Sequence, residues 1–287
     1  MQVGFPRSRQ RDDLARSRAR ARNLDAPSVS VVIPTLNEAE NLPHVLAAMP
    51  HWVDDIIVID GLSHDGTVAV ASNWARRVQV VSVHERGKGR ALRAGFEAAT
   101  TDIVVAMDAD GSNDPFELPR FVGALLSGAD VALGTRFATG GGTSDMELHR
   151  RLGNHALRLC VRMAFGTRYS DLCYGYMAFW RDVLPALDGP HAGFEVETMV
   201  HIRARQHNMH VVEIPSFERE RLSGTSHLHA VRDGLKILRT ITRERRRARA
   251  GVPPPLTTPM TTRIEIQPPW YEPVDLDLTV AEPDPAL

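Results

Sequence analysis

The sequence has 287 residues, of which 43% are hydrophobic, and a formal net charge of −1. This length and apolar content fit one α/β domain with a sizeable core and flexible ends. The near-zero net charge argues against a chain that binds nucleic acid over its whole surface, and two cysteines are too few for a disulfide framework or a zinc site.

Both ends of the chain differ in composition from the middle. Residues 1–26 hold seven arginines and three aspartates, and residues 251–287 hold nine prolines and six acidic residues. Neither stretch shows hydrophobic periodicity, so neither can bury enough apolar surface to offset the entropy of ordering. We therefore predict a disordered tail over 1–27, a folded domain over 28–250 and a second disordered tail over 251–287.

The sequence contains no recognisable targeting or membrane-spanning segment. The basic start lacks the apolar stretch of a secretory signal, and no apolar run approaches the length of a membrane span. Cys160 and Cys173 suit a reducing compartment. We therefore expect a cytoplasmic protein that does not cross a membrane by itself.

In the first half of the chain, short apolar runs alternate with helical patterns. Val- and Ile-rich runs predict buried strands, and apolar residues three and four apart predict helices. The predicted strands are 29–33, 55–60, 78–83 and 103–107, and the predicted helices are 40–49, 67–77 and 90–99. This alternation predicts an α/β fold with a mainly parallel sheet covered on both faces.

The second half is less regular and contains no internal repeat. Helical patterns cover 118–126, 150–164, 193–206 and 228–249, and strand patterns cover 131–134 and 211–214. An aromatic segment of mixed pattern lies between them, at 169–180. We therefore expect a mixed sheet in which the later elements complete the early parallel strands.

Polar clusters follow the carboxyl end of each early strand, at 34–38, 60–67, 84–89 and 108–114. Open α/β sheets bind ligands at that edge. The topology alone therefore predicts a site there, without any assumption about a metal ion.

Asp108 and Asp110 leave the fourth strand together, because residues i and i+2 of an extended chain share a face. Two close carboxylates repel each other unless a cation lies between them, and hard oxygen ligands suit Mg²⁺ or Mn²⁺. The alternative is a plain turn, since Asp, Gly, Ser and Asn are all turn formers.

The order of these motifs resembles that of family 2 glycosyltransferases. They are VVIPTLNEAENL, VIDGLSHDGT, GKGRALRAGF, MDADGSNDP and GTRF, from residue 31 to residue 137. Within the family, the chain is most similar to polyprenyl-phosphate (dolichol-phosphate) mannose synthases and their bacterial relatives, over roughly residues 29–240. The resemblance implies the GT-A fold, a Rossmann-like nucleotide-diphospho-sugar transferase with a mixed, mainly parallel sheet.

The resemblance also implies a role for each motif. Asp108, Asp110 and Ser112 would hold Mg²⁺ or Mn²⁺ on the donor's diphosphate, where a cation neutralises charge on the leaving group. Arg136 would face the donor or acceptor phosphate. The residues implied to bind the donor's base, ribose or phosphates are Pro34, Thr35, Asn37, Glu38, Asp60, Lys88, Asp108, Arg219 and Arg221.

Several of these residues have plainer alternatives. Asp60 could cap the turn that follows it, and Lys88 could lie in a surface turn, because Gly87-Lys88-Gly89 lacks the spacing of a P-loop. Arg219 and Arg221 could be a solvated pair in a loop. If they bind phosphate, the planar guanidinium would make two parallel hydrogen bonds to it.

The acceptor decides which residues catalysis needs. A phosphate monoester is already anionic near pH 7, so in-line attack with inversion would need no strong base. A sugar hydroxyl would need a carboxylate base, for which Glu195 and Glu197 are the candidates. We favour a structural role for Glu195 at a helix N-terminus and leave Glu197 open, so Asp110, Arg136 and Glu197 are the candidate catalytic residues.

We therefore expect a metal-dependent inverting glycosyltransferase that moves a hexose from GDP-mannose or a UDP-hexose to a polyprenyl phosphate. The alternatives are transfer to a soluble or polysaccharide hydroxyl and a non-catalytic sugar-nucleotide-binding protein. The sequence departs from its relatives at His227, where many have Lys, and in lacking their C-terminal membrane spans. The basic helix at 228–249 could contact anionic lipid peripherally at the inner face of the cell membrane, but we favour packing on the core with a solvated basic end.

Overall fold

The computed structural model describes Arg22, Gly189 and residues 24–76, 78–144, 146–187, 193–225, 229–251 and 265–266. Most of the two predicted tails, together with Ser226, His227 and Leu228, lies outside the described residues.

An eight-stranded mixed sheet forms the centre of the fold, in the order β10-β3-β2-β1-β4-β7-β5-β8. Neighbouring strands from β3 to β4 pair in parallel, β7 is antiparallel to β4 and β5, and β8 is parallel to β5. The predicted α/β fold with a mixed, mainly parallel sheet is confirmed. The strands are β1 (Val29–Thr35), β2 (Asp55–Asp60), β3 (Val78–Ser82), β4 (Ile103–Ala106), β5 (Val131–Thr135), β7 (Met177–Trp180), β8 (Val211–Pro215) and β10 (Glu265–Ile266).

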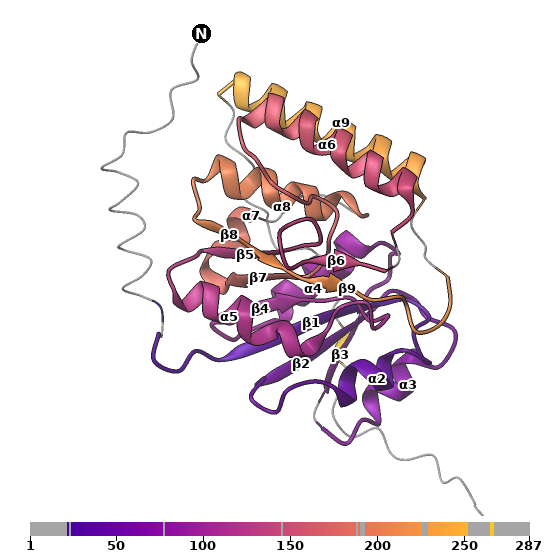
Figure 1. The fold of residues 1–287 in the computed structure, drawn as a ribbon. Helices are drawn as coiled ribbons and strands as arrows, with labels where there is room; N and C mark the ends of the chain where they lie inside the picture. The colour runs from indigo at the N-terminus through magenta and orange to yellow at the C-terminus, as the bar shows by residue number, and fades with distance from the viewer. Residues whose placement is uncertain are drawn as a thin grey trace, which may run out of the picture.

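Helices cover both faces of this sheet (Figure 1). They are α2 (Leu42–Ala47), α3 (Thr67–Ser72), α4 (Lys88–Ala98), α5 (Leu118–Leu126), α6 (Leu148–Phe165), α7 (Leu184–Leu187), α8 (Glu195–Gln206) and α9 (Ala230–Arg249). Two short strands, β6 (Gly142–Thr143) and β9 (Phe217–Glu218), pair in parallel outside the main sheet.

The core is divided between the two faces because successive side chains of a strand point to opposite sides. Val31 and Val32 are both fully buried, yet Val31 belongs to the cluster shared with α2 and α5, and Val32 to the one shared with α4 and α8. This double burial explains why the early strands are continuous apolar runs.

The long helices α6 and α9 lie side by side along one end of the molecule (Figure 1). Ile237 and Ile241 of α9 are buried with Val161 of α6 and Ile202 of α8. The favoured interpretation of the basic helix, packing on the core, is thus confirmed over its described part. No helix among the described residues is long and apolar enough to cross a membrane.

Within residues 252–287 of the predicted tail, the structure describes only Glu265–Ile266. These two residues form β10, which pairs antiparallel with β3. Without β10, β3 would be an edge strand, and the unpaired backbone groups of an edge accept a further strand.

Candidate functional site

A pocket of about 550 Å³ opens at the carboxyl ends of the parallel strands. Thr35 at the end of β1, Gly61 after β2, Gly87 after β3 and Asp108 after β4 all line it. The pocket therefore lies at the edge of the sheet where the polar clusters predict a site.

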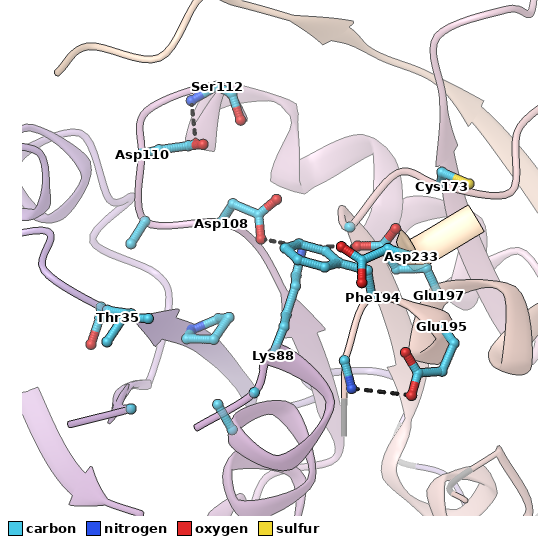
Figure 2. A pocket seen from close by; sticks show the side chains of 18 of the residues that line it. Thr35, Lys88, Asp108, Asp110, Ser112, Cys173, Phe194, Glu195, Glu197 and Asp233 are labelled. Carbon is cyan, nitrogen blue, oxygen red and sulfur yellow. Dashed lines mark hydrogen bonds and ion pairs between the residues drawn. The ribbon is translucent and has the colours of Figure 1, made fainter. Parts of the chain in front are cut away.

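Lys88 is the central cation of the pocket. Its ammonium nitrogen lies 2.6 Å from Oδ1 of Asp108 and 2.8 Å from Oε1 of Glu197 (Figure 2). Burial by itself lowers the pKa of Lys88, but the negative charges of Asp108 and Glu197 raise it by more than burial lowers it. The pKa of Lys88 therefore lies above its ordinary value, and the side chain is charged. Gly87 has φ = 139°, which lets α4 begin two residues earlier than predicted and places Lys88 in its first turn.

Gly175 passes close to this ion cluster. A Cβ atom at this position would lie 2.6 Å from the ammonium of Lys88 and 3.1 Å from carboxylate oxygens of both Asp108 and Glu197. Only glycine leaves room for the three charged groups to meet. The sequence contained no signal for this contact, because Gly175 lies outside the regular patterns.

Asp110 is held on both of its carboxylate oxygens. Oδ1 accepts a hydrogen bond from the backbone N–H of Ser112 at 3.0 Å, and Oδ2 lies 3.1 Å from Nη2 of Arg221. Nη1 of Arg221 donates to Oε1 of Glu38 at 2.9 Å. Asp108 and Asp110 therefore each face a protein cation, Lys88 and Arg221 respectively.

The donor set fits a hard divalent cation. Asp108, Asp110 and Ser112 all line the same pocket, although the described residues contain no cluster of three or more His, Cys, Asp and Glu side chains that could hold a metal ion by themselves. Mg²⁺ is often bound through one or two carboxylates, with substrate phosphates and water completing its shell. Two carboxylates beside a space large enough for a nucleotide meet that requirement.

Most of the predicted site residues meet in this pocket. Those that line it are Pro34, Thr35, Glu38, Lys88, Asp108, Asp110, Ser112, Glu197 and Arg221. Four others, Asn37, Asp60, Arg136 and Arg219, do not.

Arg136, which we predicted to face a phosphate, lies outside the pocket and contacts protein groups. All three of its guanidinium nitrogens donate within the protein, to Asp171, to Glu218 and to the carbonyl of Cys173. The side chain is 2% exposed. Arg136 therefore holds the loops behind the pocket together.

Asn37 and Asp60 support the loops beside the pocket. The side-chain oxygen of Asn37 accepts from the backbone N–H of His64 at 2.8 Å, which ties the loop after β1 to the loop after β2. The carboxylate of Asp60 accepts from the backbone N–H groups of Leu62 and Ser63 at 3.2 and 3.3 Å. This geometry agrees with the turn-cap alternative for Asp60, and the contacts of both residues with base and ribose stay a prediction.

Arg219 also lies outside the pocket. It forms an ion pair of 2.5 Å with Asp114, and its side chain is 59% exposed. The two arginines of this loop therefore differ in role, and only Arg221 reaches the predicted diphosphate region.

The two glutamates of α8 differ as well. Glu197 is buried and pairs with Lys88; burial raises its pKa, the charge of Lys88 opposes this rise, and the net pKa lies above the ordinary value. Glu195 accepts a hydrogen bond from the backbone N–H of Gly193 at 3.3 Å, in line with the structural role expected at the start of α8. In this structure Glu197 positions Lys88.

Sequence reasoning missed the far side of the pocket. Arg150 of α6 and Arg232, Asp233 and Lys236 of α9 also line it. Asp233 accepts from the backbone N–H of His229 and from Lys236, each at 3.0 Å. The available signal was the presence of cations in the first turns of both helices, but only the pairing of α6 with α9 brings them to the pocket.

The sequence of the chain is similar to those of known proteins. Residues 30–197 match the family described as Glycosyl transferase family 2. The chain is 34% identical over 209 residues to a polyprenol monophosphomannose synthase of Mycolicibacterium smegmatis, covering 68% of this chain and 79% of that protein. It is 34% identical over 216 residues to an undecaprenyl-phosphate mannosyltransferase of Micrococcus luteus, covering 69% of this chain and 86% of that protein.

Among solved structures, the fold is similar to that of glucosyl-3-phosphoglycerate synthase from Mycobacterium tuberculosis, in complex with Mn²⁺, UDP and phosphoglyceric acid. The TM-score is 0.60 at 24% identity, and the match covers 88% of this chain and 85% of that one. The predicted GT-A fold is thereby confirmed.

Proposed function

The chain belongs to glycosyl transferase family 2 and is a glycosyltransferase, and from this we propose that it moves a hexose from a nucleoside-diphosphate sugar to a polyprenyl phosphate. The observation that carries the proposal is the meeting of Lys88, Asp108, Asp110 and Arg221 in one pocket at the carboxyl ends of the strands. Paired carboxylates next to two cations suit a diphosphate leaving group and its counter-ion.

The names of the relatives support the acceptor and the sugar. One is a polyprenol monophosphomannose synthase and another an undecaprenyl-phosphate mannosyltransferase. GDP-mannose is therefore our first choice of donor, with a UDP-hexose as the alternative. Pro34, Thr35 and Glu38 line the pocket on the side of β1, where we place the donor's base and ribose.

The residues of the pocket divide the chemistry between them. A divalent cation held by Asp108, Asp110 and Ser112 would supply Lewis acidity at the diphosphate. Lys88 stays charged between Asp108 and Glu197 and stabilises negative charge that develops on the leaving group. A phosphate acceptor is already anionic, so Glu197 can remain paired with Lys88 without acting as a base.

We also propose that the acceptor reaches the pocket from a lipid surface. The outer side of the α6–α9 pair exposes Leu148, Leu152, Val231 and Leu235, with exposed fractions of 70, 63, 78 and 51%. We call this surface the α6–α9 face; it also carries the exposed cations Arg151, Arg162, Arg232, Arg239, Arg243 and Arg246. Apolar side chains beside cations suit the headgroup region of an anionic membrane, and a cytoplasmic location at the inner face of the cell membrane remains our expectation.

The transfer reaction is tested with the purified full chain, labelled GDP-mannose or UDP-glucose, and undecaprenyl phosphate in detergent. We expect transfer with Mg²⁺ or Mn²⁺, its loss in EDTA, and a rate that is roughly 100- to 1,000-fold lower for Asp110→Asn, because the cation stabilises the leaving group. Asp114→Asn is the matched control, since Asp114 lies in the same loop but outside the pocket.

Two outcomes would contradict the proposal. Undiminished transfer in EDTA by the Asp110→Asn variant would remove the metal role. Transfer to a sugar hydroxyl, with none to undecaprenyl phosphate, would replace the acceptor and return Glu197 to the position of candidate base.

A further inference from the structure

Residues 219–225 form a strap that crosses the turn carrying Asp108 and Asp110. Backbone N–H groups of Arg219 and Leu222 donate to the carbonyls of Ser112 and Asp110, at 2.9 and 3.0 Å. The strap continues to the loop after β1, where the carbonyl of Ser223 accepts from the side chain of Asn41 at 3.1 Å. It therefore joins the two loops between which a donor's diphosphate would lie.

Leu222 of the strap packs against the turn that contains Gly111. Gly111 has φ = 81°, and a Cβ atom there would lie 2.6 Å from Cδ1 of Leu222. Leu222 can approach the turn this closely only because Gly111 has no side chain, so the strap packs tightly against the turn.

Arg221 is the only residue of the strap that lines the pocket. Its guanidinium bridges Asp110, at 3.1 Å, and Glu38, at 2.9 Å. The other oxygen of Asp110 already accepts the backbone N–H of Ser112. A divalent cation that binds Asp110 must therefore compete with Arg221 for this carboxylate.

The two cations that pair with Asp108 and Asp110 are anchored differently. Lys88 lies in the first turn of α4, pairs with two carboxylates and keeps 13% of its side chain exposed. Arg221 reaches in from a segment without helix or strand and keeps 19% of its side chain exposed. Arg221 is thus the cation that can leave its carboxylate at small structural cost.

We propose that Arg221 is an exchangeable counter-cation for Asp110. When a divalent ion binds the carboxylate of Asp110, Arg221 leaves that carboxylate and pairs with the diphosphate that arrives with the ion. The planar guanidinium can make two parallel hydrogen bonds to a phosphate as well as to a carboxylate. The exchange makes the site a poor one for the metal alone and a good one for metal and diphosphate together. This inference rests on the metal role in the proposed function.

The test measures Mn²⁺ binding by the electron paramagnetic resonance signal of free Mn²⁺, for the full chain with and without GDP or UDP. For Arg221→Gln we expect Mn²⁺ alone to bind roughly tenfold tighter, because one charge-assisted hydrogen bond no longer competes. In the presence of Mn²⁺ the same variant should bind the nucleotide roughly tenfold more weakly, because the contact to the diphosphate is lost.

Two further variants make the result specific. Arg221→Lys keeps the charge and should bind Mn²⁺ alone with nearly the affinity of the unaltered chain. Arg219→Gln removes a charge from the same strap, but one that is paired with Asp114 outside the pocket, so we expect a change of less than about twofold after screening by salt.

Unchanged or weaker Mn²⁺ binding by Arg221→Gln would overturn the inference, as would an equal gain in Arg219→Gln. If the unaltered chain binds Mn²⁺ together with nucleotide, and Arg221→Gln binds both with the same affinities, the proposed exchange is wrong but the metal role stands. If no variant binds Mn²⁺ under any condition, the exchange and the proposed metal role both fail.

Discussion

At the scale of single residues, the buried pair of Arg136 and Asp171 shows how the pocket is held from behind. Their side chains are 2% and 0% exposed, a placement that is tolerated only when every charged group is paired. Burial by itself raises the pKa of Asp171, but the charge and hydrogen bonds of Arg136 outweigh it and lower the pKa below its ordinary value of 3.8.

We predict that Asp171→Asn lowers the free energy of unfolding by about 3–5 kcal/mol near neutral pH, because it leaves the charge of Arg136 buried without its main partner. The sign of the pH dependence follows from the lowered pKa. The contribution of Asp171 is present above pH 3.8 and is lost as the pH falls through the folded-state pKa. The difference between the two proteins should therefore shrink on acidification through this range, as measured by urea denaturation.

Asp182→Asn is the control for this experiment. Asp182 pairs with Arg22 but keeps 40% of its side chain exposed, so its loss should cost less than about 1 kcal/mol. An Asp171→Asn variant that is no less stable than Asp182→Asn would show that the buried network contributes little.

At the scale of elements, the closeness of α4 to the sheet determines where Lys88 lies. Gly95 of α4 packs directly on β1 and β2: a Cβ atom there would collide with Cγ1 of Val32 and lie 3.1 Å from Cγ1 of Ile59. Because α4 starts at Lys88, any outward shift of the helix would also move the cation away from Asp108 and Glu197.

We predict that Gly95→Ala destabilises the fold by about 1–3 kcal/mol through overpacking, even though Ala favours a helix over Gly by about 1 kcal/mol. Gly123→Ala in α5 is the matched control, since a Cβ atom there meets nothing within 4 Å. It should raise stability by up to about 1 kcal/mol. Thermal and urea unfolding would measure both, and a gain in stability for both variants would contradict the close packing of α4.

At the scale of the whole molecule, α6 and α9 contribute both to the α6–α9 face and to the lining of the pocket. Arg150, Arg232 and Lys236 line the pocket from the first two turns of these two helices, next to the exposed apolar residues Leu152 and Leu235. This placement supports our proposal that a lipid-linked phosphate enters the pocket while its chain stays in the membrane.

We predict that the full chain sediments with vesicles containing anionic lipid, and less with neutral vesicles or at high salt, because the cations of the face are exposed. The double variant Leu152→Ser and Leu235→Ser should bind roughly tenfold more weakly, since each side chain contributes apolar area to the contact. Leu126→Ser on α5, where the side chain is 39% exposed, is the control. Equal binding by all three proteins would exclude the α6–α9 face as the contact surface.

The sequence by itself determined most of the helices and strands and the edge of the sheet where the pocket lies, but not β7 or β10. The predicted strand 55–60 and helix 118–126 coincide with β2 and α5, because burial imposes a local pattern that any short window displays. Asp108, Asp110 and Lys88 were found in the same way: each follows a strand, and parallel strands bring their ends together.

Only the tertiary structure decided which charged side chains meet. Arg136 and Arg221 looked equivalent in the sequence, yet Arg136 is held by residues 35 and 82 positions away, whereas Arg221 reaches Glu38 across 183 positions. Such pairings depend on how distant loops pack, and no local pattern encodes them. The far wall of the pocket likewise depends on a long-range contact, because α6 and α9 form it only by packing side by side.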